Sequence, residues 1–171
     1  MTSRDSAAAD LEQASERWLA WLTAETTGRR DPPGSSLTAA EGPTPSGSVL
    51  AATEGSAPAG SALVALWDAL EEWFASDDFA VSPLAAAVVA PPDGRGPAAH
   101  AVLVRHRQAT RRLLEDLARS AGARDPAALA GQLLTLVEGA MAGALVDRHP
   151  GVARHARELT RIALAAAAAH G

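Results

Sequence analysis

Hydrophobic residues recur along most of the chain with the three-to-four-residue spacing of an amphipathic α-helix. The clearest case is 61–75, where one face carries Leu63, Leu66, Trp67, Leu70, Trp73 and Phe74. Ser61 is its expected N-cap, because a serine side chain can accept a hydrogen bond from the first helical turn. A first helix is predicted over 10–25, ended by Gly28, with an inner face of Leu11, Trp18, Leu19, Trp21 and Leu22.

Three further helices are predicted in the second half of the chain. The first spans 98–121, is followed by Gly122, and has an inner face of Val102, Leu103, His106, Thr110, Leu113, Leu114 and Leu117. Asp125 and Pro126 then form an N-cap and first-turn signal for a helix over 126–147. The last helix is predicted over 151–169, with Val152, Ala156, Leu159, Ile162, Ala163 and Ala166 on one face. A short helix is expected at 84–90, and turns are expected over 76–83.

The helix at 126–147 is apolar in nearly every direction. Its large side chains are Leu129, Leu133, Leu134, Leu136, Val137, Met141, Leu145 and Val146. A helix of this kind requires burial on all sides, and a small domain has little room for one. We therefore expect a partner subunit to cover part of it, giving a homodimer through 126–169.

Proline, glycine and serine interrupt the helical pattern over 29–60, which is predicted to be a linker or loop. Loops of this length are uncommon inside compact domains. The chain is thus divided into an N-terminal helix (1–28), this segment (29–60) and a helical domain (61–171). A second, shorter loop is expected over 91–97.

Composition narrows the possible chemistry. The chain has 171 residues and no cysteine, and all of its basic residues are arginines. Thiolate catalysis, cysteine-based zinc sites, Schiff bases and a P-loop lysine are therefore excluded. The abundance of alanine, glycine, proline and arginine is typical of actinobacterial proteins.

The net charge of −5 is unfavourable for binding duplex DNA. The first ten residues lack the apolar core of a signal peptide. No run of about 18 strongly apolar residues predicts a membrane span. We therefore expect a cytoplasmic protein.

Three segments resemble the C-terminal effector-binding domain of TetR-family transcriptional regulators, especially the LmrA/YxaF-like group. They are ALWDALEEWFASDDF (65–79), SPLAAAVVAPPDGRGP (82–97) and VLVRHRQATRRLLEDLARSAGARDPAALAGQLLTLVEGAMAGALV (102–146). Glu138 and Gly139 look like the acidic-glycine pair of the family's first dimerisation helix. The resemblance implies an all-α bundle with an effector cavity, whose last two helices pair with a symmetry mate.

The sequence departs from this family at its N-terminal end. A TetR repressor begins with a three-helix DNA-binding domain that contains a helix-turn-helix, whereas here one predicted helix and the 29–60 segment precede residue 61. That helix would correspond to the one that links the two domains of a repressor. Arg29 and Arg30 are the only basic pair in the first sixty residues, and they fall in the predicted loop. We therefore expect no DNA binding.

Two titratable residues on predicted inner faces are candidates for chemistry. His106 is either a ligand contact or general base, or a core histidine that hydrogen-bonds to a backbone carbonyl. Glu138 is either a pocket acid or a structural hydrogen-bonding group at the dimer seam. The remaining expected ligand-binding residues are Trp67, Leu70, Trp73, Phe74, Val102, Arg105 and Met141, although aromatic stripes are also typical of cores. Trp18 and Trp21 would complete the aromatic wall.

No metal or cofactor site is predicted. His100 and His106, like His149 and His155, are six residues apart, which is not the spacing of two ligands on one helix. The arginines at 105, 107, 111 and 112 either hold an anionic group or form a solvated face.

These observations lead to three hypotheses. The first is a module that binds a small, largely apolar molecule without binding DNA. The second is a cofactor-independent enzyme of a natural-product pathway, which catalyses an elimination, cyclisation or isomerisation with His106 and Glu138 as candidate groups. The third is a dimeric scaffold with no pocket.

Overall fold

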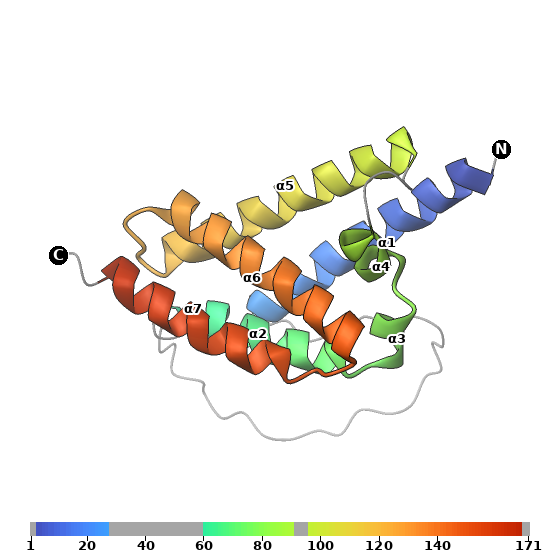
Figure 1. Ribbon diagram of the computed structural model, residues 1–171. Coiled ribbons are helices and arrows are strands. Elements are labelled where there is room, and N and C mark those ends of the chain that lie inside the picture. Colours follow the sequence, from blue (N-terminus) through green and yellow to red (C-terminus); the bar gives the residue numbers. More distant parts are fainter. Residues whose placement is uncertain (1–2, 28–59, 91–95, 169–171) are drawn as a thin grey trace, which may run out of the picture.

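The protein is described here by a computed structural model that places residues 3–27, 60–90 and 96–168. Every element in these ranges is an α-helix, and they contain no strand, so the predicted all-α class is confirmed (Figure 1). The predicted 29–60 segment, apart from Gly60, and most of the 91–97 loop lie outside the described residues.

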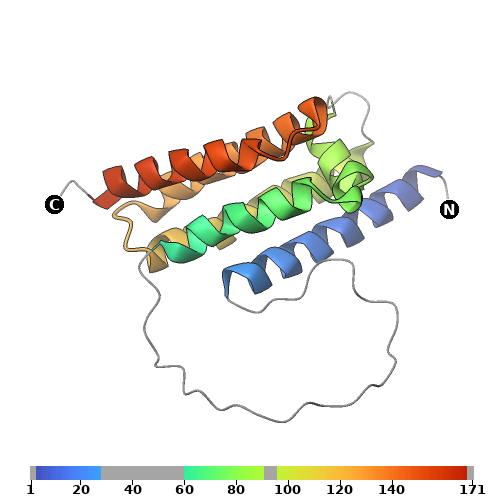
Figure 2. The same ribbon diagram turned by 90° about the horizontal axis from the view of Figure 1, so that it is seen from below.

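The helices are α1 (Ser3–Thr26), α2 (Ser61–Phe74), α3 (Asp77–Ala80), α4 (Pro83–Val89), α5 (Pro97–Ser120), α6 (Pro126–Asp147) and α7 (Val152–Ala168). Figure 2 shows α2 between α1 and α7. On the other side of the molecule α5 packs against α1 and α6, and α6 packs against α7. The five long helices thus form a closed ring, in the order α7, α2, α1, α5 and α6. The short helix α4 contacts α1 and α6.

Several helix ends follow the predicted local chemistry. The Asp125 side chain accepts a hydrogen bond from the Ala128 N–H at 2.9 Å, and Pro126 opens α6, as predicted. Gly122 follows α5 with a φ of 79°, which only glycine adopts readily. The Ala123 N–H donates to the Ala118 carbonyl at 3.0 Å across this glycine, which completes a Schellman-type end.

The main differences from prediction are at the starts of two helices and in one additional short helix. The N-cap of α2 is Gly60, with a φ of 88°, so the prediction that Ser61 caps this helix is wrong. α1 begins at Ser3 rather than residue 10, because the alanines at 7–9 favour helix although they carry no amphipathic pattern. α3 occupies the stretch predicted as turns, and the Ser76 side chain accepts from the Phe79 N–H at its start.

A buried hydrogen bond fixes the position of α7 on α2. The indole N–H of Trp67 donates to the Thr160 hydroxyl at 2.7 Å, and both residues are fully buried. Two ion pairs, Arg157 with Asp68 and Arg154 with Glu71, join the same two helices at the surface. The buried bond contributes more to register than the exposed pairs do, because water screens exposed charges.

α6 is buried on one side only. Its inward residues are Leu129, Ala130, Leu133, Leu134, Val137, Ala140, Met141 and Ala144. Val146, by contrast, is 75% exposed, so a single chain does not provide the all-round burial that the apolar sequence calls for.

Among the described helices, α6 is long and apolar enough to cross a membrane, which corrects the expectation that no segment is. In the most apolar 18-residue window, 44% of the residues are buried inside the bundle. Core helices of soluble proteins often meet the same criterion, so this is weak evidence for a membrane span.

α7 has two apolar faces where one was predicted. Ala153, Ala156 and Thr160 face the core, whereas Leu159 and Ile162 are 50% and 58% exposed. The face predicted from the sequence thus runs from the buried Ala156 to the exposed Leu159 and Ile162. The physical reason is that α7 is oriented by its contacts with α2, which leave its larger aliphatic side chains outside.

Candidate functional site

An aromatic cluster fills the space between α1, α2 and α3. Its members are Trp18, Trp21, Trp73, Phe74 and Phe79. Trp73 is central: its ring centroid lies 4.9 Å from that of Phe79, 5.8 Å from Phe74, 5.9 Å from Trp21 and 6.3 Å from Trp18. Trp18 and Trp21 of α1 thus pack against Trp73 of α2, and their role in the wall of a ligand pocket stays a prediction.

His106 lies at the edge of this cluster, on the buried face of α5. Its ring centroid is 5.1 Å from that of Trp18, with the rings edge to face. Its Nδ1 is 2.9 Å from the Ser15 hydroxyl of α1, and its Nε2 is 3.5 Å from the Thr110 hydroxyl. The imidazole therefore connects α1 to α5 through a serine, and both of its nitrogens face hydroxyl groups.

The hydrogen-bond partners define the protonation of His106. The Thr110 hydroxyl donates its proton to the His106 carbonyl at 3.0 Å, so its oxygen is left to accept from Nε2–H. Nδ1 then accepts from the Ser15 hydroxyl. Burial lowers the pKa of His106 from 6.5 to about 4, so the ring is neutral at pH 7. The expected backbone-carbonyl partner for the ring is replaced by two side-chain hydroxyls.

The indole N–H of Trp18 is buried and has no hydrogen-bond partner among the described residues. The side chain of Trp18 is only 4% exposed. Trp67 shows the usual arrangement, in which a buried indole N–H reaches an acceptor. Unpaired buried donors are rare and costly, so the one at Trp18 needs a specific explanation.

Glu138 and Arg105 form separate ion pairs at the surface. Glu138, half-buried on α6, meets the guanidinium of Arg107 at 2.9 Å. Burial raises the pKa of Glu138, and the charge of Arg107 opposes that rise. Arg105 of α5 pairs with Glu12 of α1 at 2.6 Å. Neither pair brings a charge to the imidazole of His106.

The structure thus brings together only part of the predicted ligand-binding set. Trp73, Phe74 and His106 belong to one buried region with Trp18. Trp67, Leu70, Val102 and Met141 are buried in the same hydrophobic core. The two catalytic candidates do not converge, since His106 meets hydroxyls and Glu138 meets an arginine.

Besides Phe79, which falls in the stretch predicted as turns, the sequence interpretation missed Ser15 as a site residue. It is 6% exposed and supplies the partner of His106 Nδ1. Its position was detectable, because residues 11, 15, 18 and 22 follow the spacing of one helix face. A serine between apolar positions of that face indicates a buried hydroxyl in need of a partner.

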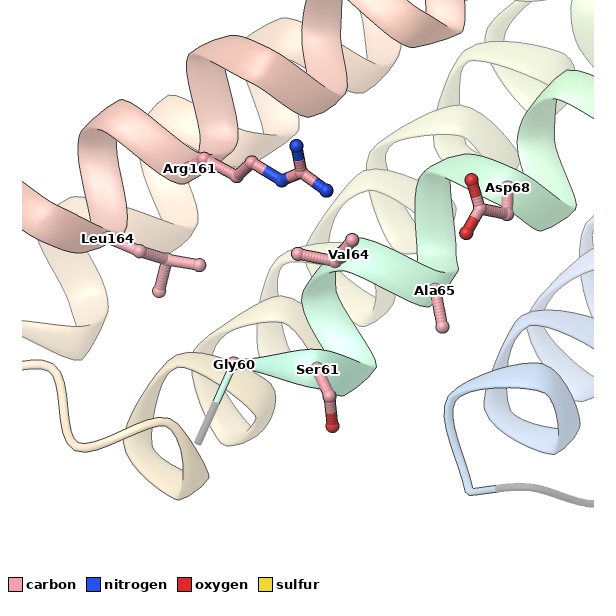
Figure 3. A pocket seen from close by; sticks show the side chains of 7 residues that line it. All are labelled: Gly60, Ser61, Val64, Ala65, Asp68, Arg161 and Leu164. Carbon is pink, nitrogen blue, oxygen red and sulfur yellow. The ribbon is translucent and has the colours of Figure 1, made fainter. Parts of the chain in front are cut away.

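A separate surface groove of about 450 Å³ lies between the start of α2 and the end of α7. It is open to solvent and is lined by Gly60, Ser61, Val64, Ala65, Asp68, Arg161 and Leu164 (Figure 3). Arg161 extends from α7 toward α2 in this view. The groove combines one acid, one base and a small apolar wall, and its residues are too far apart in sequence to have been grouped by motif.

Comparison with known proteins gives no further constraint. No protein-family model matches the sequence, and neither a curated protein nor a solved structure has significant similarity to the chain.

Proposed function

We propose that the protein is a helical module that binds a small, largely apolar molecule and does not itself bind DNA. The observation that carries this proposal is the unpaired indole N–H of Trp18, buried in an aromatic cluster next to a neutral histidine. A core evolved for packing alone gains nothing from an unsatisfied donor, whereas a ligand site needs a few polar groups in an apolar wall. The sequence resemblance to TetR-type effector domains supports the same conclusion.

The proposed module works without a cofactor and in the cytoplasm. Its charge supports the absence of DNA binding, because the net charge is −5 and several arginines are already engaged by acids. The pairs of Arg105, Arg107 and Arg119 with glutamates reduce the positive potential along α5. Arg111 and Arg112 remain exposed on this helix, and two such residues are typical of a solvated face.

We further propose that the module is a homodimer assembled through α6 and α7. Exposed positions recur on α6 at Gln132, Thr135, Gly139 and Val146, and on α7 at His155, Leu159, Ile162 and Ala166. Both series follow one side of a helix, with steps of three or four residues and one two-turn step of seven residues from Gly139 to Val146, and they include small side chains and exposed aliphatic ones. A second copy related by a two-fold axis would cover these residues with their own equivalents and form a four-helix seam.

The dimer is tested by charging its proposed centre. Replacing Leu159 and Ile162 together with glutamate places four carboxylates in the seam of each dimer, since both copies carry the change. We expect the native chain to have twice the mass of one chain by light scattering at micromolar concentration. The double variant is expected to be monomeric, with its dimer dissociation constant raised at least 100-fold, or about 3 kcal/mol.

A matched control adds the same charge elsewhere. The double variant Ala101→Glu, Val104→Glu alters two exposed positions of α5. We expect this variant to keep the mass of a dimer by light scattering. A native protein that remains monomeric at these concentrations would remove the dimer from the proposal. If the Leu159→Glu, Ile162→Glu variant stays dimeric, the dimer interface lies on another face of the molecule.

Ligand binding is tested with N-phenyl-1-naphthylamine, a neutral aromatic dye that brightens in apolar surroundings. We expect saturable binding at one site per chain, with quenching of tryptophan emission. A short duplex DNA in the same low-salt buffer should show no binding. Absence of saturable dye binding would count against the module, and salt-dependent tight binding of the duplex would contradict the claim about DNA.

The enzyme hypothesis has less support than ligand binding. The Ser15 hydroxyl lies 2.9 Å from His106 Nδ1, a distance suited to a nucleophile and its base. A histidine whose pKa is about 4 is a weak base, however, and no acid orients its other nitrogen. Catalysis of an elimination, cyclisation or isomerisation would need a second group beside His106, and Glu138 is occupied by Arg107.

A further inference from the structure

We infer that the aromatic cluster takes a neutral, planar aromatic ligand whose single hydrogen-bond acceptor, such as a carbonyl oxygen, meets the indole N–H of Trp18. This inference rests on the proposed small-molecule binding and specifies the chemical class of the ligand. Three features carry it: the unpaired donor, the lack of a net charge at the site, and the aromatic rings around it.

The unpaired donor requires an acceptor. An indole nitrogen carries one N–H and no lone pair available for hydrogen bonding, so it can only donate. The hydroxyls of Ser15 and Thr110 are directed to the His106 ring, and neither forms a hydrogen bond with the Trp18 N–H in the described arrangement. A carbonyl, lactone or amide oxygen would satisfy it and recover the desolvation cost of the N–H.

The charge around the cluster selects a neutral ligand. The uncharged imidazole of His106 lies against Trp18, and the partners of that imidazole are the neutral hydroxyls of Ser15 and Thr110. At the surface above this region, Arg105 is neutralised by Glu12. A carboxylate or ammonium ligand would therefore lose its hydration without gaining a counter-charge.

The rings favour a flat aromatic molecule. Trp73 already makes tilted or edge-to-face contacts with four other rings, and such contacts are available to any aromatic ligand that enters the cluster. Aromatic pairs of this kind contribute beyond their buried area. A ligand ring can therefore replace contacts that the cluster loses on opening.

On this proposal a ligand enters the cluster when α1, which contributes Trp18 and Trp21 to it, moves away from the other helices. Two polar contacts join α1 to α5: the exposed ion pair of Glu12 with Arg105, and the bond of Ser15 to His106. The other buried contacts of α1 are apolar and can be remade with an aromatic ligand. α1 is thus the element whose displacement exposes the Trp18 donor.

The test compares three bicyclic probes of similar size: coumarin, which has a carbonyl acceptor, naphthalene, which has none, and 2-naphthoate, which is anionic. The chain has four tryptophans, so a ¹⁵N-labelled sample gives four indole resonances, and the spectrum of Trp18→Phe identifies that of Trp18. We expect coumarin to shift the Trp18 N–H resonance downfield. Naphthalene should perturb the cluster without this downfield shift, and naphthoate should leave the cluster unchanged.

Affinity gives a second, independent measurement. Trp18→Phe should weaken the binding of coumarin about tenfold, which corresponds to the loss of one net hydrogen bond. It should weaken the binding of naphthalene much less. Equal weakening of both probes, without a selective downfield shift, would overturn the inference and leave the proposed module standing. Naphthoate binding to the cluster as tightly as coumarin would overturn it too.

If the proposed function itself is wrong, the experiment gives a different result from a failure of this inference alone. In that case none of the three probes, nor the naphthylamine dye, would perturb a tryptophan of the cluster. If the Trp18→Phe chain does not fold, the native chain still decides the question. Its four indole resonances either show a selective shift with coumarin or do not.

Discussion

Replacing Trp73 with alanine is expected to lower the free energy of unfolding by about 3 to 5 kcal/mol. Trp73 is 9% exposed and lies against four other aromatic rings contributed by α1, α2 and α3. Its removal would leave a cavity that these rings cannot fill by small shifts, because they belong to three different helices. Urea denaturation followed by circular dichroism measures the loss.

Val81→Ala is the matched control for this change. Val81 lies directly after α3, near Trp73 in the sequence, but its side chain is 79% exposed. Its truncation should therefore alter the free energy of unfolding by less than about 0.5 kcal/mol. A Trp73→Ala loss as small as that of the control would show that the aromatic cluster is not packed as described.

The second large effect is acid destabilisation through His106. The folded chain holds this histidine at a pKa of about 4, whereas an unfolded chain titrates it near 6.5. The unfolded state therefore binds more protons between these values, and the free energy of unfolding falls as the pH drops through that window. A shift of this size costs the native state about 3 kcal/mol at pH 4 relative to pH 7.

The effect is isolated by comparing pH profiles of unfolding. His106→Asn keeps a group at the position of Nδ1 to bond Ser15 but removes the titration. We expect the native chain to lose about 3 kcal/mol more than this variant between pH 7 and pH 4. The comparison cancels the opposite contribution of Glu138, whose pKa is raised by burial. His149→Asn, at an exposed histidine, should keep the native profile, and parallel profiles for native and His106→Asn chains would contradict the neutral, buried imidazole.

The extent of the helices was largely predictable, whereas their ends depended on tertiary contacts. Periodicity located four of the five long helices, because burial of one face is encoded at every third or fourth residue, and the Asp125–Pro126 start signal located α6. Gly60 was not recognised as the N-cap of α2, because the sequence reports neither its φ of 88°, which favours glycine, nor Leu164 of α7, which lies 3.2 Å from the position that a Cβ would take. Periodicity also could not tell which aliphatic side of α7 faces inward, because that orientation comes from the bond of Trp67 to Thr160.

The candidate site was predictable in its parts but not in its connections. The tryptophans, Phe74 and His106 were found because they lie on inner faces of predicted helices, whereas Phe79 was not, because its short helix α3 was predicted as turns. The pairing of His106 with Ser15 joins residues 91 positions apart, and no local pattern reports such a contact. The same limitation applies to Glu138, whose partner Arg107 lies on another helix.

The closed ring of helices has a consequence for the order of folding. α5, α6 and α7 follow one another through short connections, so their mutual contacts cost little chain entropy to form. The contacts that close the ring span far more chain, as the bond from Ser15 to His106 and that from Trp67 to Thr160 show. Assembly should therefore begin from the C-terminal three helices and finish when the two N-terminal ones close the ring, with the long-range closures limiting the rate.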